Sequence, residues 1–122
     1  MMEAPWELPE GLREAFADDA RDVVDEILAL YLQDSEPLIG AILAAHASGD
    51  GEALSMLLHR IKGSSSQVGA LRLSSLCLRA ESALCDSGPT SPALAECLGS
   101  LDDEWQRAAG AIREWLSQNS NA

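Results

Sequence analysis

Apolar residues recur with a helical period along most of this chain, and that period constrains its fold more than any other feature. Each periodic stretch ends at a run rich in Gly, Ser, Asp or Pro, and the β-branched runs typical of strands are almost absent. The stretches span about residues 18–48, 51–68, 71–87 and 91–118. We therefore expect an all-α fold, an antiparallel up-down-up-down four-helix bundle joined by short polar turns.

Two details are expected before and within the second helix. Leu12 and Phe16 follow a proline and predict a short additional N-terminal helix, lying across one end of the bundle. Asp18-Asp19 is expected to cap the second helix. Pro37 is expected to bend or interrupt that helix near Ser35, because proline removes one helical hydrogen bond.

The last periodic stretch predicts one long helix. Ser91-Pro92 places a capping hydroxyl directly before a proline at the first helical position. Apolar residues then keep helical spacing through Leu116 without a break. The residues from Gln118 to Ala122 are expected to form a frayed tail.

The length of 122 residues suits one compact domain, expected over 1–122 with its core at about 15–118. A formal net charge of −12 disfavours nucleic acid and anionic membranes as partners, because both require clustered Lys and Arg. No leader-like segment opens the chain and no run of about 18 apolar residues occurs. We expect a cytoplasmic protein without membrane insertion. A monomer is expected, unless Trp6, Trp105 or Trp115 forms an exposed apolar patch.

Three cysteines, Cys77, Cys85 and Cys97, lie in helical patterns without any C-x-x-C spacing. They are expected to be reduced and mostly buried, with no role beyond packing assigned to them. The paired spacing of zinc ligands is absent, so no metal site is expected. The acidic run Asp102-Asp103-Glu104 is interpreted as a solvated helix face, because consecutive helical residues do not converge.

The stretch from His59 to Ser66 has an unusual composition for the interior of a helix. At about 100° per residue, His59, Lys62, Gly63 and Ser66 point away from the apolar stripe, so the histidine is predicted to be exposed. A mid-helix glycine costs roughly 1 kcal/mol relative to alanine. Positions four apart are neighbours on a helix, so Gly63 leaves one side of the His59 ring open to a partner.

Charge is also unusual around this stretch. Lys62 is the only lysine in the chain, and it lies three residues from His59, within reach of a phosphate on the imidazole. The segment from Ala53 to Ala80 contains four basic residues and no acid. An otherwise acidic chain is therefore expected to have one locally positive face.

A carboxylate is expected at the same level as the histidine. In an antiparallel hairpin folded about residue 70, His59 and Glu81 are equidistant from the turn. Glu81 is a candidate to accept a hydrogen bond from one ring nitrogen and to leave the other as a nucleophile. An exposed helical carboxylate without this role is the alternative, because the hairpin level does not fix the direction of the side chain.

The run from His59 to Ala70 resembles the signature of histidine-containing phosphotransfer (HPt) domains, roughly H-x-x-K-G-S-S-x-x-x-G-A. The resemblance implies that His59 is phosphorylated on the ring nitrogen farther from the backbone. It also implies that Lys62 neutralises the phosphoryl group, that Gly63 keeps the approach open, and that Glu81 holds the other nitrogen. Ser66 occupies a variable position of this pattern and is named as a further supporting residue.

The resemblance further implies a carrier that moves a phosphoryl group between the aspartates of receiver domains, which belong to response regulators or a hybrid sensor kinase. No ATP-binding loop occurs, so no kinase activity and no cofactor are expected, with Mg²⁺ held by the partner receiver. Two alternatives remain. One is the phosphoacceptor domain of a chemotaxis-type kinase, and the other is a helical adaptor that binds receivers without carrying phosphate.

Overall fold

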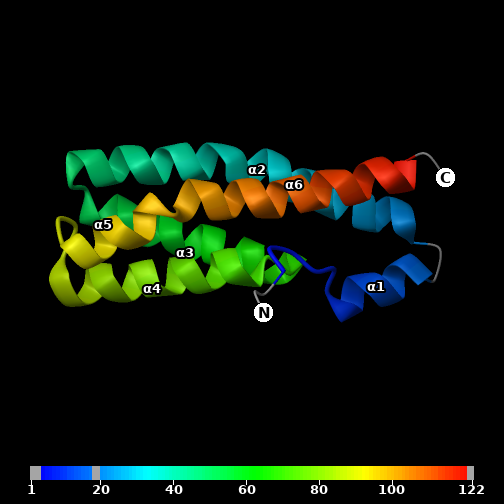
Figure 1. The fold of residues 1–122 in the computed structure, drawn as a ribbon, viewed down its shortest axis with the longest axis horizontal. Coiled ribbons are helices and arrows are strands. Elements are labelled where there is room, and N and C mark those ends of the chain that lie inside the picture. The colour runs from blue at the N-terminus through cyan, green and yellow to red at the C-terminus, as the bar shows by residue number, and fades with distance from the viewer. Residues whose placement is uncertain (1–3, 18–19, 121–122) are drawn as a thin grey trace.

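The computed structural model describes residues 4–17 and 20–120, and within them six α-helices. The helices are α1 (Glu10–Ala17), α2 (Arg21–Ser48), α3 (Gly51–Val68), α4 (Leu71–Ser87), α5 (Pro92–Gly99) and α6 (Leu101–Ser120). Four of them, α2, α3, α4 and α6, run alternately up and down as a bundle (Figure 1). The predicted all-helical bundle and the additional N-terminal helix are confirmed.

Each of the four long helices packs against two other long helices. α3 lies between α2 and α4, while α6 contacts α4 and α2 and so closes the ring. α5 packs against α4 and leads into α6, whereas α1 contacts α2 at the end of the bundle beyond the α3–α4 turn (Figure 1). This arrangement leaves one side of α3 open between α2 and α4.

The core consists of the apolar stripes that the sequence predicts. On α3, the stripe of Leu54, Leu58, Ile61 and Val68 is buried, and Ser65 fills the gap between the last two. Trp105 on α6 is the largest fully buried side chain. Burial of one leucine-sized side chain contributes roughly 1.5–3 kcal/mol to stability. Turning a helix about its axis would expose its buried stripe, so the stripes fix the rotation of each helix.

The prediction of a single last helix is wrong, because the helix is interrupted at Ser100, between α5 and α6. The Ser91 cap is confirmed, since its hydroxyl accepts a hydrogen bond from the Leu94 amide at 3.2 Å. At the break, the Ser100 amide bonds to the Cys97 carbonyl, three residues back, and Gly99 precedes it. Glycine is a poor helix former, and the tighter bond ends the first helical segment.

α2 is continuous from Arg21 to Ser48, so an interruption at Pro37 is wrong, and a bend there stays a prediction. Ser35 and Ile39 on either side of the proline are buried, and the Trp105 indole donates a 2.8 Å hydrogen bond to the Ser35 hydroxyl. Tertiary packing therefore holds the helix across a residue that lacks an amide hydrogen.

The ends of the helices differ from the expectations in two ways. α2 begins after Ala20 with no side-chain cap, and the proposed cap Asp18-Asp19 lies outside the described residues. The expected fraying from Gln118 is not observed as far as Ser120, where α6 ends, and residues 121–122 lie outside the description.

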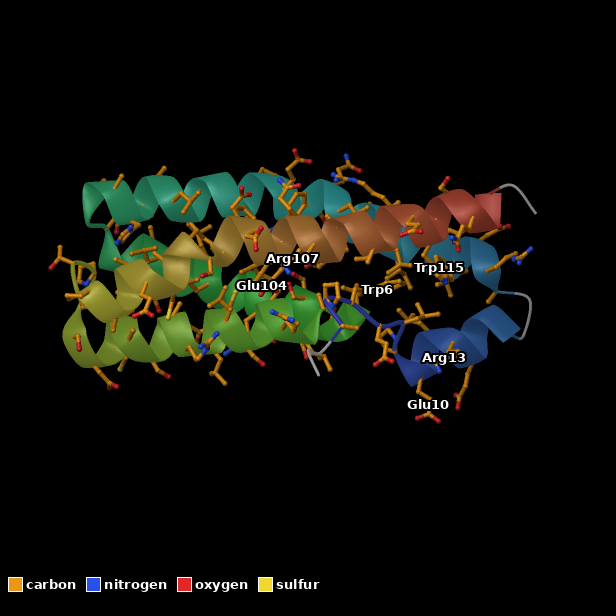
Figure 2. The ribbon with its side chains drawn as sticks, in the orientation of Figure 1. Trp6, Glu10, Arg13, Glu104, Arg107 and Trp115 are labelled. Carbon is orange, nitrogen blue, oxygen red and sulfur yellow. The ribbon has the colours of Figure 1, made fainter. Side chains whose placement is uncertain are left out.

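The segment before α1 packs against the turn between α3 and α4. The Trp6 indole donates a 2.6 Å hydrogen bond to the Val68 carbonyl, and the Glu7 amide contacts the Gly69 carbonyl at 3.5 Å. The Trp6 ring also meets Trp115 edge to face, with centroids 6.1 Å apart (Figure 2). Trp105 is buried, and Trp6 and Trp115 are half-buried and packed against the core, so the three tryptophans do not form the exposed patch that the sequence left open.

The three cysteines are free, but they differ in burial. Cys77 is buried in the core and Cys97 is half-buried, whereas Cys85 is exposed and contradicts the expectation of burial. Burial, and secondarily the nearby Glu81 carboxylate, raises the pKa of the Cys77 thiol to about 12, while Lys62 acts in the opposite direction. The Cys77 thiol is therefore protonated and unreactive at neutral pH.

One helix, α2, is long and apolar enough to cross a membrane by length and hydropathy alone. Its residues Val24, Leu28 and Ile42 belong to the core cluster of the bundle. A core helix meets the same criteria, and the absence of membrane insertion stays a prediction.

Candidate functional site

His59 stands on the outward side of the middle of α3. Its side chain is 77% exposed, while Leu58 and Ile61 on the opposite side of the helix are completely buried. Because these two residues lock the rotation of α3 in the core, the imidazole is presented to solvent by a rigid element. The predicted exposure of His59 is confirmed.

Lys62 and Glu81 form an ion pair beside the histidine. The Lys62 Nζ lies 3.2 Å from both carboxylate oxygens of Glu81 and donates a hydrogen bond to Oε2. The two side chains are 25% and 23% exposed. The pair joins α3 to α4, and a 3.2 Å hydrogen bond from the Ser74 hydroxyl to the Lys62 carbonyl joins the helices at the same level. Lys62 is therefore held within the α3–α4 interface.

Glu81 lies at the level of His59, as the hairpin predicts, but the two side chains are not hydrogen bonded. The His59 Nδ1 is 4.0 Å from Glu81 Oε1, which is beyond hydrogen-bond distance. Within the described residues, Oε1 is buried without a hydrogen-bond partner. The expected bond to the ring is thus absent in this state, and the partner that Glu81 bonds is Lys62.

Gly63 leaves open space next to the histidine. A Cβ atom built at this position meets no atom within 4 Å, so the fold itself does not require glycine here. A residue that costs helix stability without relieving a clash is consistent with the predicted open approach to His59.

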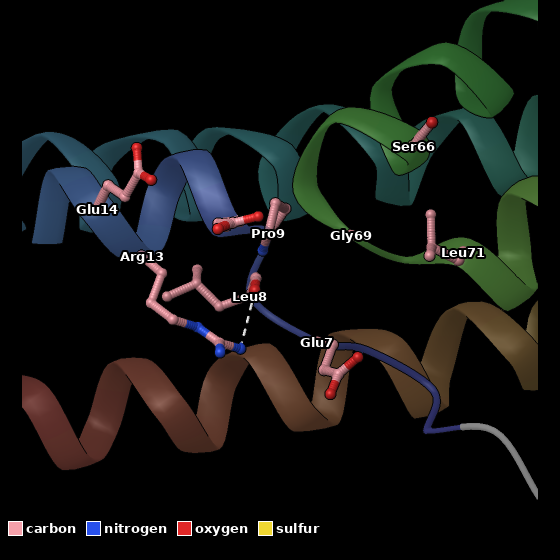
Figure 3. A pocket seen from close by; sticks show the side chains of 9 residues that line it. Glu7, Leu8, Pro9, Arg13, Glu14, Ser66, Gly69 and Leu71 are labelled. Atoms are coloured by element: carbon pink, nitrogen blue, oxygen red, sulfur yellow. Dashed lines mark hydrogen bonds between the residues drawn. The ribbon is translucent and has the colours of Figure 1, made fainter.

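Ser66 lies away from the imidazole. It is seven residues from His59, about 10 Å along the helix, and it lines a cavity of about 600 Å³ between α1 and the α3–α4 turn. Figure 3 shows Ser66 and Leu71 on one side of this cavity and Arg13 and Glu14 on the other. The structure therefore groups His59, Lys62, Gly63 and Glu81, and places Ser66 outside that group.

Comparisons with known proteins agree with this geometry. The family model described as Hpt domain matches residues 11–118. This chain belongs to the Hpt domain family. The Arabidopsis thaliana histidine-containing phosphotransfer protein 2 is 30% identical over 103 residues, which are 82% of this chain. The chain spans 65% of the length of that relative.

Solved structures show the same fold. Histidine-containing phosphotransfer protein B from Pseudomonas aeruginosa superposes with a TM-score of 0.79 at 23% identity, covering 95% of this chain and 98% of that one. The HPT domain of a sensor hybrid histidine kinase from Shewanella gives a TM-score of 0.73 at 25% identity, covering 91% and 94%. The likeness covers nearly the whole bundle.

The positive face expected of this Hpt domain is not formed by the whole acid-free segment. Arg72 is bound to Glu104 of α6 at 2.8 Å, and together with Arg79 it lines a cavity on the α4–α6 side of the bundle. Lys62 is paired with Glu81. Glu81 lies in α4 one residue beyond the acid-free window, and Glu104 comes from α6, so the charge pattern of the window alone predicted neither pairing.

An apolar surface on α2 was also missed. Val23, Ile27 and Leu30 are exposed, although they share the helical period of the core residues. Ile27 and Leu30 line a groove of about 230 Å³ with Ser64 and Gln67 of α3, the helix that bears His59. The signal was present in the sequence, because the apolar stripe of α2 is wider than one helix can bury against its neighbours.

No group of three or more metal-ligating side chains occurs among residues 4–17 and 20–120. Of the acidic run on α6, Asp103 pairs with Arg107 at 2.9 Å and Glu104 with Arg72. These acids lie in the first turn of α6, where negative charge is favourable.

Proposed function

We propose that this Hpt domain carries a phosphoryl group on His59 between the aspartates of receiver domains in a two-component phosphorelay. The observation that supports this most directly is an exposed imidazole on a rigid helix with Lys62 and Glu81 beside it. Nδ1 is the ring nitrogen that lies toward Glu81, which leaves Nε2 as the nucleophile.

The transfer is an in-line displacement at phosphorus. The Nε2 lone pair forms the N–P bond while the P–O bond to the receiver aspartate breaks, and its electron pair leaves with the carboxylate. The ring retains its proton on Nδ1 and becomes positively charged. A second receiver aspartate reverses the step, so the domain ends unchanged.

The domain is proposed to act as a carrier rather than a kinase. Phosphoryl transfer depends mainly on positioning and charge neutralisation, and the receiver is expected to supply Mg²⁺ and most catalytic groups. The domain needs no cofactor of its own for this role, and Ser66 has no assigned part in the transfer itself. A cytoplasmic location is part of the proposal, because receivers act there.

The docking surface for the receiver is proposed to include the exposed residues Val23, Ile27 and Leu30, defined here as the α2 apolar surface. Its groove borders α3, so a receiver centred on His59 also covers it. A specific protein–protein interface buries about 800 Å² on each partner, which is far more than one histidine side chain can supply. The receiver must therefore also contact a neighbouring surface of this kind.

The decisive experiment is phosphotransfer from a phosphorylated receiver in the presence of Mg²⁺. We expect acid-labile, alkali-stable label on the native chain and on a His46→Gln variant, but none on His59→Gln. His46 is the matched control, because it is the only other histidine. Label that persists in His59→Gln contradicts the proposal. Tight receiver binding without any label favours a non-phosphorylated adaptor instead.

A further inference from the structure

The cavity between α1 and the α3–α4 turn has walls that the fold holds in place. The Trp6 indole is bonded to the Val68 carbonyl at 2.6 Å, at the end of α3. A Cβ atom at Gly69 would collide with the Glu7 carbonyl, so the N-terminal segment crosses the turn in direct contact with its backbone. The cavity of about 600 Å³ beside this contact, named here the α1 cavity, is therefore preformed.

Apolar side chains line the α1 cavity from both sides. Leu8 and Pro9 are half-buried on the side of the N-terminal segment, and Leu71 of α4 is 58% exposed on the other side. A cavity of this size is large enough for a ligand or for several side chains of a partner. An apolar side chain seated there would cover Leu71, which the fold leaves in contact with water.

The charge around the α1 cavity is negative. Glu7, Glu10 and Glu14 line it and are exposed, and none of them has an ion-pair partner within 4.0 Å in the part of the chain that the structure describes. Arg13 also lines the cavity, but its guanidinium donates a 3.3 Å hydrogen bond to the Leu8 carbonyl and is turned away from Glu14 (Figure 3). The lining therefore favours a ligand that carries positive charge.

We propose that the α1 cavity docks a basic segment of a protein partner. An apolar side chain of the segment lies between Leu8 and Leu71, and its Lys or Arg side chains lie beside the three carboxylates. Nucleic acid and anionic lipid do not suit this site, because their phosphates meet the same carboxylates. A metal ion or a simple ammonium gains nothing from the apolar walls, whereas a basic segment with apolar side chains uses both features.

This docking site is separate from the phosphoacceptor. Ser66 lines the cavity from α3, and it is seven positions from His59, about 10 Å along the helix. Lys62 and Glu81 do not line the cavity. The docking site needs no phosphate on His59, so it stands or falls independently of the carrier function.

The probe is the pentapeptide acetyl-Lys-Leu-Lys-Leu-Lys-amide, titrated into the full chain labelled with nitrogen-15. We expect saturable amide shifts confined to residues 7–14 and 66–71, with a Kd on the order of 0.1–1 mM. The counterpart with serine in place of leucine has the same charge, and it should bind at least about tenfold more weakly, because a buried leucine contributes roughly 1.5–3 kcal/mol. Equal binding of the two peptides would overturn the apolar part of the site.

A triple variant tests the carboxylates. Glu7→Gln, Glu10→Gln and Glu14→Gln together should raise the Kd of the leucine peptide by about fivefold, since exposed ion pairs are individually weak. A control triple variant removes the same net charge from exposed acids elsewhere and should change the Kd by less than about twofold. Its substitutions are Glu52→Gln, Asp86→Asn and Glu96→Gln.

A pair of leucine variants tests the apolar wall without changing the charge. Leu71→Ser should raise the Kd by about fivefold. Leu78→Ser is the matched control, because Leu78 lies on the same helix, is 54% exposed and does not line the cavity, so the Kd should stay unchanged. Urea unfolding checks that every variant is folded.

Three results would overturn the docking site. They are the absence of saturable shifts at millimolar peptide, shifts spread over the other acidic surfaces, and equal weakening by the control triple variant. The His59→Gln variant should bind the peptide as the native chain does, so a failure of phosphotransfer leaves this test unaffected.

Discussion

Tyr31 of α2 and Ser65 of α3 share a hydrogen bond of 2.8 Å between their hydroxyl oxygens inside the core. Ser65 is completely buried, and Tyr31 is 5% exposed. The bond ties the helix that bears His59 to the helix that bears the α2 apolar surface. It also lies close to a second buried bond, from the Trp105 indole to Ser35, so polar contacts fix the relative positions of α2, α3 and α6.

The stability losses from removing the two sides of the Tyr31–Ser65 bond should not add. Tyr31→Phe leaves the buried Ser65 hydroxyl without this partner, and Ser65→Ala leaves the Tyr31 hydroxyl with Ser35 alone, so each variant should lose about 1–3 kcal/mol of unfolding free energy. The double variant should lose clearly less than the sum of the single losses. Urea unfolding of the four proteins measures this, and strictly additive losses would show that the bond is not coupled.

Alkaline pH should destabilise the fold, because the buried Tyr31 hydroxyl and Cys77 thiol resist deprotonation in the folded state. Burial raises the pKa of Tyr31 from 10.0 to about 12, although hydrogen bonds to Ser65 and Ser35 act against it, and burial raises that of Cys77 from 9.0 to about 12. The native state therefore binds more protons than the unfolded state above about pH 9, so stability is full below that pH and falls as pH rises toward about 12.

The variants Tyr31→Phe and Cys77→Ala isolate these contributions. Each should flatten the decline of the urea midpoint between pH 9 and pH 11 relative to the native chain, whatever its effect at pH 7. An identical pH dependence in all three proteins would contradict the assignment of the decline to these two groups.

Gly69 should tolerate substitution less well than Gly49, although both end a helix with positive φ. Their φ angles are +90° and +70°, and alanine in this region costs roughly 1–2 kcal/mol. A Cβ at Gly69 also collides with the Glu7 carbonyl, whereas one at Gly49 meets nothing within 4 Å. Gly69→Ala should therefore lose more unfolding free energy and displace the N-terminal segment, which the fluorescence of Trp6 reports. Equal losses would contradict the collision.

The sequence predicted the parts of the fold that depend on local pattern. The stripe of α3 and the Ser91 cap are set by spacing and by capping chemistry, and these predictions are confirmed. The continuity of α2 across Pro37 depends on tertiary packing, which a pattern along one helix does not contain. The break at Ser100 follows Gly99, a local signal that the unbroken apolar spacing concealed.

The candidate site shows the same division. The period of α3 predicts that His59 is exposed, and the hairpin predicts that Glu81 is level with it. Which cation or donor the carboxylate binds depends on side-chain reach and on differences of less than 1 Å, so the Lys62–Glu81 pair was not foreseen. The pairing of Arg72 with Glu104 likewise required the position of α6.

Gly63→Ala should stabilise the domain and impair its function. A Cβ at Gly63 meets nothing within 4 Å, so alanine should raise the unfolding free energy by up to about 1 kcal/mol. The added methyl group stands beside His59 and should slow phosphotransfer by about tenfold or more. Gly110→Ala on α6 is the matched control, because it also meets no neighbour and should stabilise without slowing transfer. Unchanged transfer by Gly63→Ala would remove the proposed role of Gly63.

The α2 apolar surface should contribute to receiver affinity. Leu30 is 48% exposed and lines the groove against α3, whereas Leu43, on the same helix, is 39% exposed but lies about 20 Å farther along it. Burial of a leucine side chain contributes roughly 1.5–3 kcal/mol, so Leu30→Asp should raise the Kd for the receiver by at least about tenfold.

Leu43→Asp adds the same charge to the same helix and should leave the Kd within about twofold. Titration calorimetry with an unphosphorylated receiver measures both variants, and urea unfolding checks that each is folded. If Leu43→Asp weakens binding as much as Leu30→Asp, net charge rather than the groove determines affinity. If neither does, the receiver reaches His59 from the α4 side, where Glu81 and Lys62 would form the centre of the contact instead of its edge.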